Sequence, residues 1–184
     1  SSTLADGIHS LTTKVTDAAG NVSSASTALA VTIDTATATP STPDMIADGG
    51  TSSPGDTAGR STSDNITYRN RPTFTGTAEA GSYVTLSATN AAGTVIADIA
   101  TGVTSGTNAA GAAGTTGSWT FQVTTAKTLA DGSYTITAVA TDAAGNVSST
   151  SSALTVTIDT TPPSAPTQVR LAPAYDTGTI GDGY

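Results

Sequence analysis

Cysteine is absent from this chain of 184 residues, which excludes a disulfide framework and any thiol chemistry. Aromatic residues make up only 4% of the sequence, so any core must be thin and built from small side chains. No apolar run approaches the length of about 18 residues that a membrane-spanning helix needs. We therefore expect no membrane insertion.

Basic residues are also scarce. Six Lys and Arg stand against 14 acidic residues, and the net charge is −8. Nucleic acids and anionic membranes are poor partners for such a chain. All but one of the acidic residues are Asp, which has two interpretations. Asp marks turns, and it also supplies compact oxygen ligands for calcium.

The groups that most enzymes use are missing as well. The only His is His9 and the only Glu is Glu79. There is no Cys, and the only His lies in the incomplete first copy of the repeat described below, so an activated nucleophile has no evident base. No Gly-rich phosphate loop, Cys/His metal cluster or basic stripe occurs. The sequence predicts that the chain is not an enzyme.

What the chain does contain is an internal repeat. Residues 3–35 and 128–160 are identical at 23 of 33 positions, at a constant offset of 125. Thr16-Asp17-Ala18-Ala19-Gly20-Asn21 recurs as Thr141-Asp142-Ala143-Ala144-Gly145-Asn146. Residues 1–35 are predicted to be the end of one repeat, comprising its last two strands. Residues 36–160 form a complete repeat with a Pro/Asp-rich N-terminal linker, and 161–184 contain a linker and the start of the next.

Alternating apolar and polar residues predict strands in the complete repeat. Inward-facing residues include Phe74, Leu86, Trp119, Ile136 and Val156. Such a pattern, with no helical period, predicts an all-β fold of two packed sheets with seven strands. The seven predicted strands cover residues 65–68, 72–79, 82–90, 94–103, 118–125, 133–141 and 147–159.

The segment before the sixth predicted strand reads Leu129-Ala-Asp-Gly-Ser-Tyr134. It is typical of a corner in which a Tyr hydroxyl bonds to the backbone a few residues upstream. An ordinary buried Tyr is the alternative. In the first copy His9 takes the place of Tyr134, and we interpret it as a corner substitution, not a metal ligand.

These strings, with Val156-Thr-Ile-Asp-Thr-Thr-Pro-Pro-Ser-Ala-Pro166, resemble the bacterial immunoglobulin-like repeats of giant surface adhesins. The resemblance covers nearly the whole chain. It implies tandem immunoglobulin-like sandwiches, export by type I secretion, calcium near the domain junctions and a spacer role outside the cell. Arg60, and the shorter spacing of Asp176 and Asp182 compared with Asp56 and Asp64, depart from a strict repeat.

The sandwich topology also places the Asp residues. With an odd number of strands, the chain enters at one pole and leaves at the other. Converging carboxylates repel one another, and extracellular calcium would neutralise them. The expected calcium ligands are Asp34, Asp56, Asp64 and Asp142 at the N-terminal pole, and Asp131, Asp159, Asp176 and Asp182 at the other.

The function expected from these features is a spacer in a cell-surface adhesin, a rod stiffened by calcium that extends an adhesive tip. Its partners would be the neighbouring repeats of the same chain. One alternative is a subunit of an extracellular filament or surface layer, in which copies exchange strands or pack laterally. Another is a carbohydrate-binding module, for which only Tyr68, Tyr83 and Tyr175 offer exposed aromatic rings.

Overall fold

The computed structural model describes residues 3–46, 65–106 and 115–167, and nearly all regular structure in it is β. Near the N-terminus, β1 (Gly7–Leu11) and β2 (Leu29–Ile33) form an antiparallel hairpin. The remaining strands form two sheets that face each other. No helix in the described ranges is long and apolar enough to cross a bilayer.

One sheet has three strands in the order β3-β5-β8, and the other has five in the order β4-β10-β9-β6-β7. All pairs are antiparallel except that of β4 with β10. A short 3-10 helix, η1 (Thr125–Lys127), follows β8. The strand bounds are β3 (Asp44–Ile46), β4 (Ile66–Thr67), β5 (Thr73–Glu79), β6 (Tyr83–Asn90), β7 (Val95–Val103), β8 (Thr116–Gln122), β9 (Gly132–Thr141) and β10 (Leu154–Ile158).

The two-sheet sandwich predicted from the sequence is confirmed, and each of the seven predicted strands has a counterpart from β4 to β10. The prediction missed β3, which raises the described sandwich to eight strands. β3 is only three residues long and follows Pro43, so it shows no period that a sequence pattern could reveal.

Alternate residues of the long strands fill the space between the sheets. On β6 and β9 the inward residues other than Tyr134 are small or medium-sized and fully buried, while their neighbours face outward. Alternation of this kind is what one solvated face and one buried face require. The core includes Phe74, Val84, Leu86, Ala88, Ile99, Trp119, Val123, Leu129, Ile136, Ala138, Ala140, Val156 and Ile158.

The last predicted strand was too long at its start. β10 begins only at Leu154. Before it, the side chains of two serines take the place of backbone carbonyls in the hydrogen bonds to β9. The Ser148 hydroxyl accepts the Ala140 N–H at 3.0 Å, and the Ser151 hydroxyl accepts the Ala138 N–H at 3.0 Å. Each Ser N–H still donates to the carbonyl of the same Ala at 2.9 Å. Side-chain oxygens therefore stand in for carbonyls where the segment diverges from β9.

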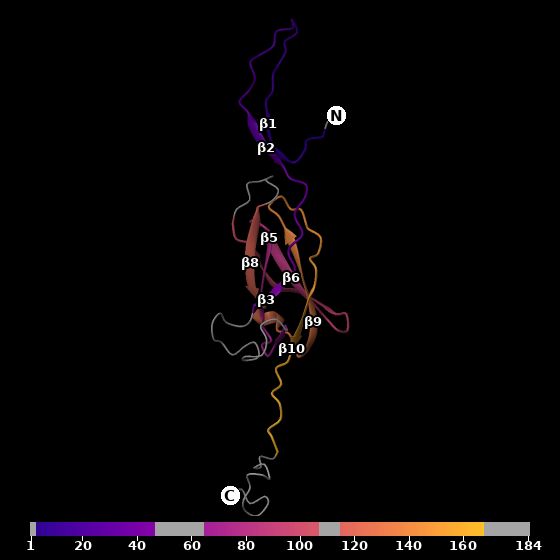
Figure 1. Ribbon diagram of the computed structural model, residues 1–184. Coiled ribbons are helices and arrows are strands. Elements are labelled where there is room, and N and C mark those ends of the chain that lie inside the picture. The colour runs from indigo at the N-terminus through magenta and orange to yellow at the C-terminus, as the bar shows by residue number, and fades with distance from the viewer. Residues whose placement is uncertain (1–2, 47–64, 107–114, 168–184) are drawn as a thin grey trace, which may run out of the picture.

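The molecule is elongated, as Figure 1 shows. The β1–β2 hairpin projects from one end of the sandwich, and residues 159–167 leave at the opposite end. The chain therefore enters and leaves the repeat at opposite poles, as expected, although the described sandwich has eight strands and not the odd number on which the expectation was based. We call these the N-terminal pole and the C-terminal pole.

The hairpin carries apolar side chains that are not covered in this chain. Val15 is 71% exposed, Leu29 63% and Leu11 44%. The equivalents of Val15 and Leu29 in the complete repeat are Ala140, which is fully buried, and Leu154, which packs against the core. The hairpin thus exposes side chains whose equivalents in the complete repeat lie on the core side of the sandwich.

Candidate functional site

Three carboxylates meet at the N-terminal pole. Asp34 follows β2, Glu79 ends β5 and Asp142 follows β9, so each lies at the end of a strand. One carboxylate oxygen from each lies within 4.8 Å of the others. Asp142 is buried, while Asp34 and Glu79 are half-buried. The group joins the end of one repeat to the body of the next.

Asp142 is held by the tight loop that runs to Asn146. Its Oδ1 accepts the N–H groups of Ala144 and Asn146, both at 2.9 Å. Gly145 has a φ of +93°, a conformation that L side chains rarely adopt and that explains the Gly in the Asp-Ala-Ala-Gly-Asn string. The same loop in the first copy, 17–21, makes the corresponding bonds at 2.9 and 2.8 Å. The loop therefore takes the same conformation in both copies, as their identical local sequence predicts.

Asn146 connects the two repeats. Its Nδ2 donates to the Asp142 Oδ2 at 2.8 Å and to the Asp34 carbonyl at 3.1 Å, and it lies 3.5 Å from the Asp34 Oδ1. The linker adds a further contact, because the Thr37 hydroxyl donates to the Glu79 Oε2 at 2.9 Å. Neutral donors thus offset part of the repulsion among the carboxylates.

The pKa of Asp142 reflects this environment. Burial is the largest single influence and raises the pKa, but the hydrogen bonds from Asn146, Ala144 and Gly145 together outweigh it and lower the pKa below its usual value. A carboxyl whose pKa falls on folding adds stability above its unfolded pKa, near 4. That stability is lost as the pH falls through the folded value.

Asn146→Ala should therefore make folding less dependent on pH. Removing the amide takes away the largest of the influences that lower the Asp142 pKa. We expect a loss of about 1 kcal/mol or more at pH 7 and a smaller loss at an acidic pH below the lowered pKa of folded Asp142. Urea unfolding at both pH values, followed by fluorescence of the single Trp, measures the difference. Equal losses at the two pH values would contradict this account.

Two other predicted ligands, Asp131 and Asp159, lie at the C-terminal pole and have identified hydrogen-bond partners. The Asp131 carboxylate accepts the Thr160 N–H at 3.0 Å and the hydroxyls of Thr160 and Thr161 at 2.6 and 2.9 Å. These bonds lower the pKa of Asp131. The Asp159 Oδ1 accepts the Thr161 N–H at 3.1 Å. Within the described ranges, neither belongs to a group of three carboxylates.

The structure thus brings together two of the eight predicted ligands, Asp34 and Asp142. Asp56, Asp64, Asp176 and Asp182 lie outside the described residues. Glu79 was not among the ligands expected from the sequence. The available signal was its position at the end of a predicted strand that points to the same pole as Asp34 and Asp142.

The corner motif behaves differently in the two copies. His9 Nε2 lies 2.7 Å from the Ala5 carbonyl, four residues upstream, as expected for a corner substitution. Tyr134 is buried at 7% exposure, yet its hydroxyl makes no hydrogen bond with any described residue. The predicted Tyr134 bond is therefore absent from the described part of the chain, and Tyr134 acts as a core side chain.

Tyr134→Phe should consequently have little effect. Because the substitution leaves no buried group without its hydrogen-bond partner, the expected change in unfolding free energy is within about 0.5 kcal/mol. Chemical denaturation of the two proteins provides the measurement. A loss above about 1 kcal/mol would show that the hydroxyl is bonded after all.

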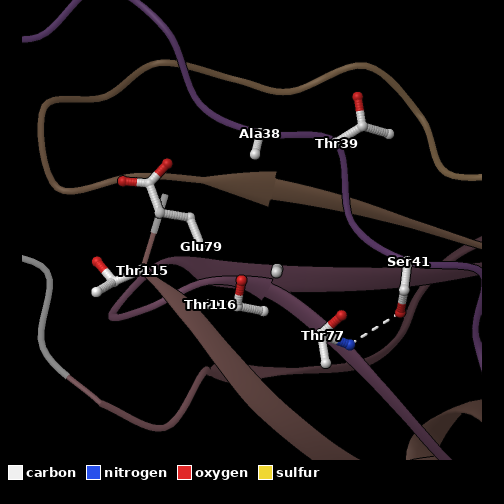
Figure 2. Close-up of a pocket in the computed structure, with 8 residues that line it drawn as sticks. Ala38, Thr39, Ser41, Thr77, Glu79, Thr115 and Thr116 are labelled. Atoms are coloured by element: carbon white, nitrogen blue, oxygen red, sulfur yellow. Dashed lines mark hydrogen bonds between the residues drawn. The ribbon is translucent and has the colours of Figure 1, made fainter. Parts of the chain in front are cut away.

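A cavity of about 150 Å³ lies beside the carboxylate group, between the linker and the ends of β5 and β8. Figure 2 shows hydroxyls from Ser41, Thr77 and Thr116 around it, and the Glu79 carboxylate nearby. No aromatic ring is among its eight lining residues. It therefore lacks the flat apolar surface on which a sugar ring could stack.

The sequence matches the family model of the bacterial Ig-like domain over residues 1–35 and 45–160. The chain belongs to the bacterial Ig-like domain family. This match covers both the hairpin and the sandwich, and it confirms the fold expected from the resemblance.

One similar solved structure is the crystal structure of a tetra-tandem repeat in the extending region of a large adhesion protein. It is 21% identical with a TM-score of 0.40, and the alignment covers 85% of this chain. The chain spans about a third of that structure, 33% of its length. No curated protein is significantly similar.

Proposed function

We propose that this chain is a structural spacer of an extracellular bacterial adhesin, with no catalytic role. The carboxylate group at the junction is the observation that carries the proposal. It brings Asp34 close to Glu79 and Asp142 of the complete repeat, so a cation bound there would fix how the two segments meet. Because the chain enters and leaves the repeat at opposite poles, repeats joined in a row would form an extended rod.

We propose calcium as the ion that Asp34, Glu79 and Asp142 hold. Calcium takes six to eight oxygen ligands at about 2.3–2.6 Å, so two ligands on opposite sides are about 4.6–5.2 Å apart. The three carboxylate oxygens lie within 4.8 Å of one another, which fits that spacing. Bound calcium would supply the positive charge that this acidic chain lacks.

A filament or surface-layer subunit is the second candidate. The exposed apolar side chains of the hairpin favour it, because they offer a surface that strands of another copy could cover. A carbohydrate-binding module receives less support. Tyr68 and Tyr83 are 49% and 48% exposed, but Tyr68 follows β4 whereas Tyr83 begins β6, and the cavity beside Glu79 has no aromatic lining.

Calcium should stabilise the folded chain. At a calcium concentration 100 times the Kd, one site that exists only in the folded state adds about 2.7 kcal/mol. Thermal melts in millimolar calcium and in chelator measure the effect, with magnesium as the control for charge screening. Equal midpoints in calcium and chelator would remove calcium from the proposal.

The double variant Asp34→Asn with Glu79→Gln should abolish the calcium-dependent part of the shift. Asp44→Asn with Asp98→Asn is the matched control, because it makes the same charge change at two exposed positions outside the carboxylate group. A control pair that also abolished the shift would indicate that calcium acts on the net charge alone.

A further inference from the structure

A spacer between a cell and a surface is loaded along its length, and the strands that receive the load can be identified. At the N-terminal pole the chain runs from Asp34 through the linker into β3, the first strand of the sandwich. At the C-terminal pole the load enters β10 from Asp159. Both strands would be pulled along their own axes, so their hydrogen bonds would be loaded together.

The attachment of β3 is one-sided. Among the described strands it lies at the edge of its sheet and pairs only with β5, over three residues. Ser41 adds two bonds just before it, because the Ser41 N–H donates to the Thr77 carbonyl and the Thr77 N–H donates to the Ser41 hydroxyl, both at 2.8 Å. Met45 is the strand's buried side chain, at 8% exposure. We call residues 41–46 the latch.

The other loaded strand is held on both sides. β10 lies between β9 and β4, and it pairs with β9 over five residues. On its β4 side, the Thr157 N–H donates to the Asn65 carbonyl at 2.8 Å, and the Asp159 N–H donates to the Thr67 carbonyl at 2.9 Å. β4 is parallel to β10 and follows the latch in the chain. If the latch opened, the load would therefore pass to the β4–β10 pair.

We propose that the repeat has a second function as a tension-released length reserve. Under load the latch separates from β5, the chain before β4 lengthens the spacer, and the β4–β10 pair keeps the rest of the sandwich folded. When the load falls, the latch pairs with β5 again. This inference rests on the proposed spacer function, since only a chain under tension would use the reserve.

The length gained has an upper bound. Residues 41–64 number about 24, and a fully extended chain spans at most about 3.3–3.6 Å per residue, so opening the latch adds no more than roughly 80 Å. Unfolding residues 65–159 would add on the order of 300 Å. The two events are therefore distinguishable by their step lengths.

Optical tweezers can apply this load to the full chain. Because the sequence has no Cys, Ala36→Cys and Ser164→Cys provide two unique attachment points, both exposed and on either side of the sandwich. We expect a first, reversible step of at most about 80 Å, followed by a second of on the order of 300 Å. A single step to full length would overturn the proposal.

Two variants assign the steps. Ser41→Ala removes the acceptor of the Thr77 N–H, and at constant force it should shorten the lifetime of the first state roughly 3- to 10-fold without changing the second. Ile158→Val trims a buried residue of β10 and should shorten only the second lifetime. If Ser41→Ala left the first lifetime unchanged, the latch would not be its origin. The steps are measured within one repeat, so they do not depend on whether calcium stiffens the junction.

Discussion

Gly117→Ala should destabilise the sandwich by about 3 kcal/mol or more. Gly117 lies in β8, where the backbones of three segments come together. A Cβ at this position would overlap the Ser105 carbonyl oxygen and lie 3.0 Å from both the Ala80 Cα and the Thr104 Cβ. Two of these neighbours are backbone atoms, which cannot rotate away as a side chain can.

The same contacts explain the cost in structural terms. Adjacent to Gly117, the Ser105 N–H donates to the Ser118 carbonyl at 2.7 Å, and the Ser118 N–H donates to the Ser105 hydroxyl at 2.9 Å. These bonds join the end of β7 to β8, across the gap between the two sheets. Making room for a methyl group at Gly117 would lengthen them. The substitution should therefore weaken the connection between the sheets as well as the local packing.

Gly93→Ala is the matched control. Gly93 has a φ of +80° and nothing within 4 Å of its would-be Cβ, so Ala there carries only backbone strain. We expect a cost of about 1 kcal/mol. Urea unfolding followed by Trp119 fluorescence compares the two variants. If both lost the same amount, the close approach at Gly117 would not be a packing constraint.

Much of the fold follows from sequence because its determinants are local. The inward positions of β6, β9 and β10 were predicted by alternation, and the loop 142–146 is reproduced at 17–21 with nearly identical bonds. The start of β10 was not predicted, because Ser148 and Ser151 replace ladder bonds through side chains and leave the alternation visible in the sequence unchanged.

The candidate site was predicted less completely than the fold. Asp34 and Asp142 could be placed at one pole by counting strands, since every second strand end points the same way. Strand counting places Glu79 at that pole as well, but its distance from Asp34 depends on how the linker packs against β5, which a strand count does not show. Tyr134 shows a different limit of the sequence-based prediction. The corner motif is present in the sequence, but the hydrogen bond expected of its hydroxyl is not found among the described residues.

Calcium should change the shape of a longer chain more than its secondary structure. With strands rising about 3.3 Å per residue, each complete repeat should add on the order of 35–45 Å to a rod. In a chain of two or three complete repeats, calcium bound at the equivalents of Asp34, Glu79 and Asp142 would hold each junction in one geometry. X-ray scattering should then report a narrow, extended particle, with a maximum dimension that grows by this increment per repeat.

Chelation should shorten that maximum dimension and broaden its distribution while circular dichroism stays unchanged. Without the ion, three carboxylates within 4.8 Å repel one another, and Asn146 and Thr37 offset only part of the repulsion. The linker residues around Thr37 would then be freer to bend. Asp34→Asn with Glu79→Gln should lower the repulsion too, so this pair should make the particle insensitive to calcium at that junction. Asp44→Asn with Asp98→Asn should keep the calcium response. A compact particle in calcium would instead favour a packed assembly, because a spacer must gain length with every repeat.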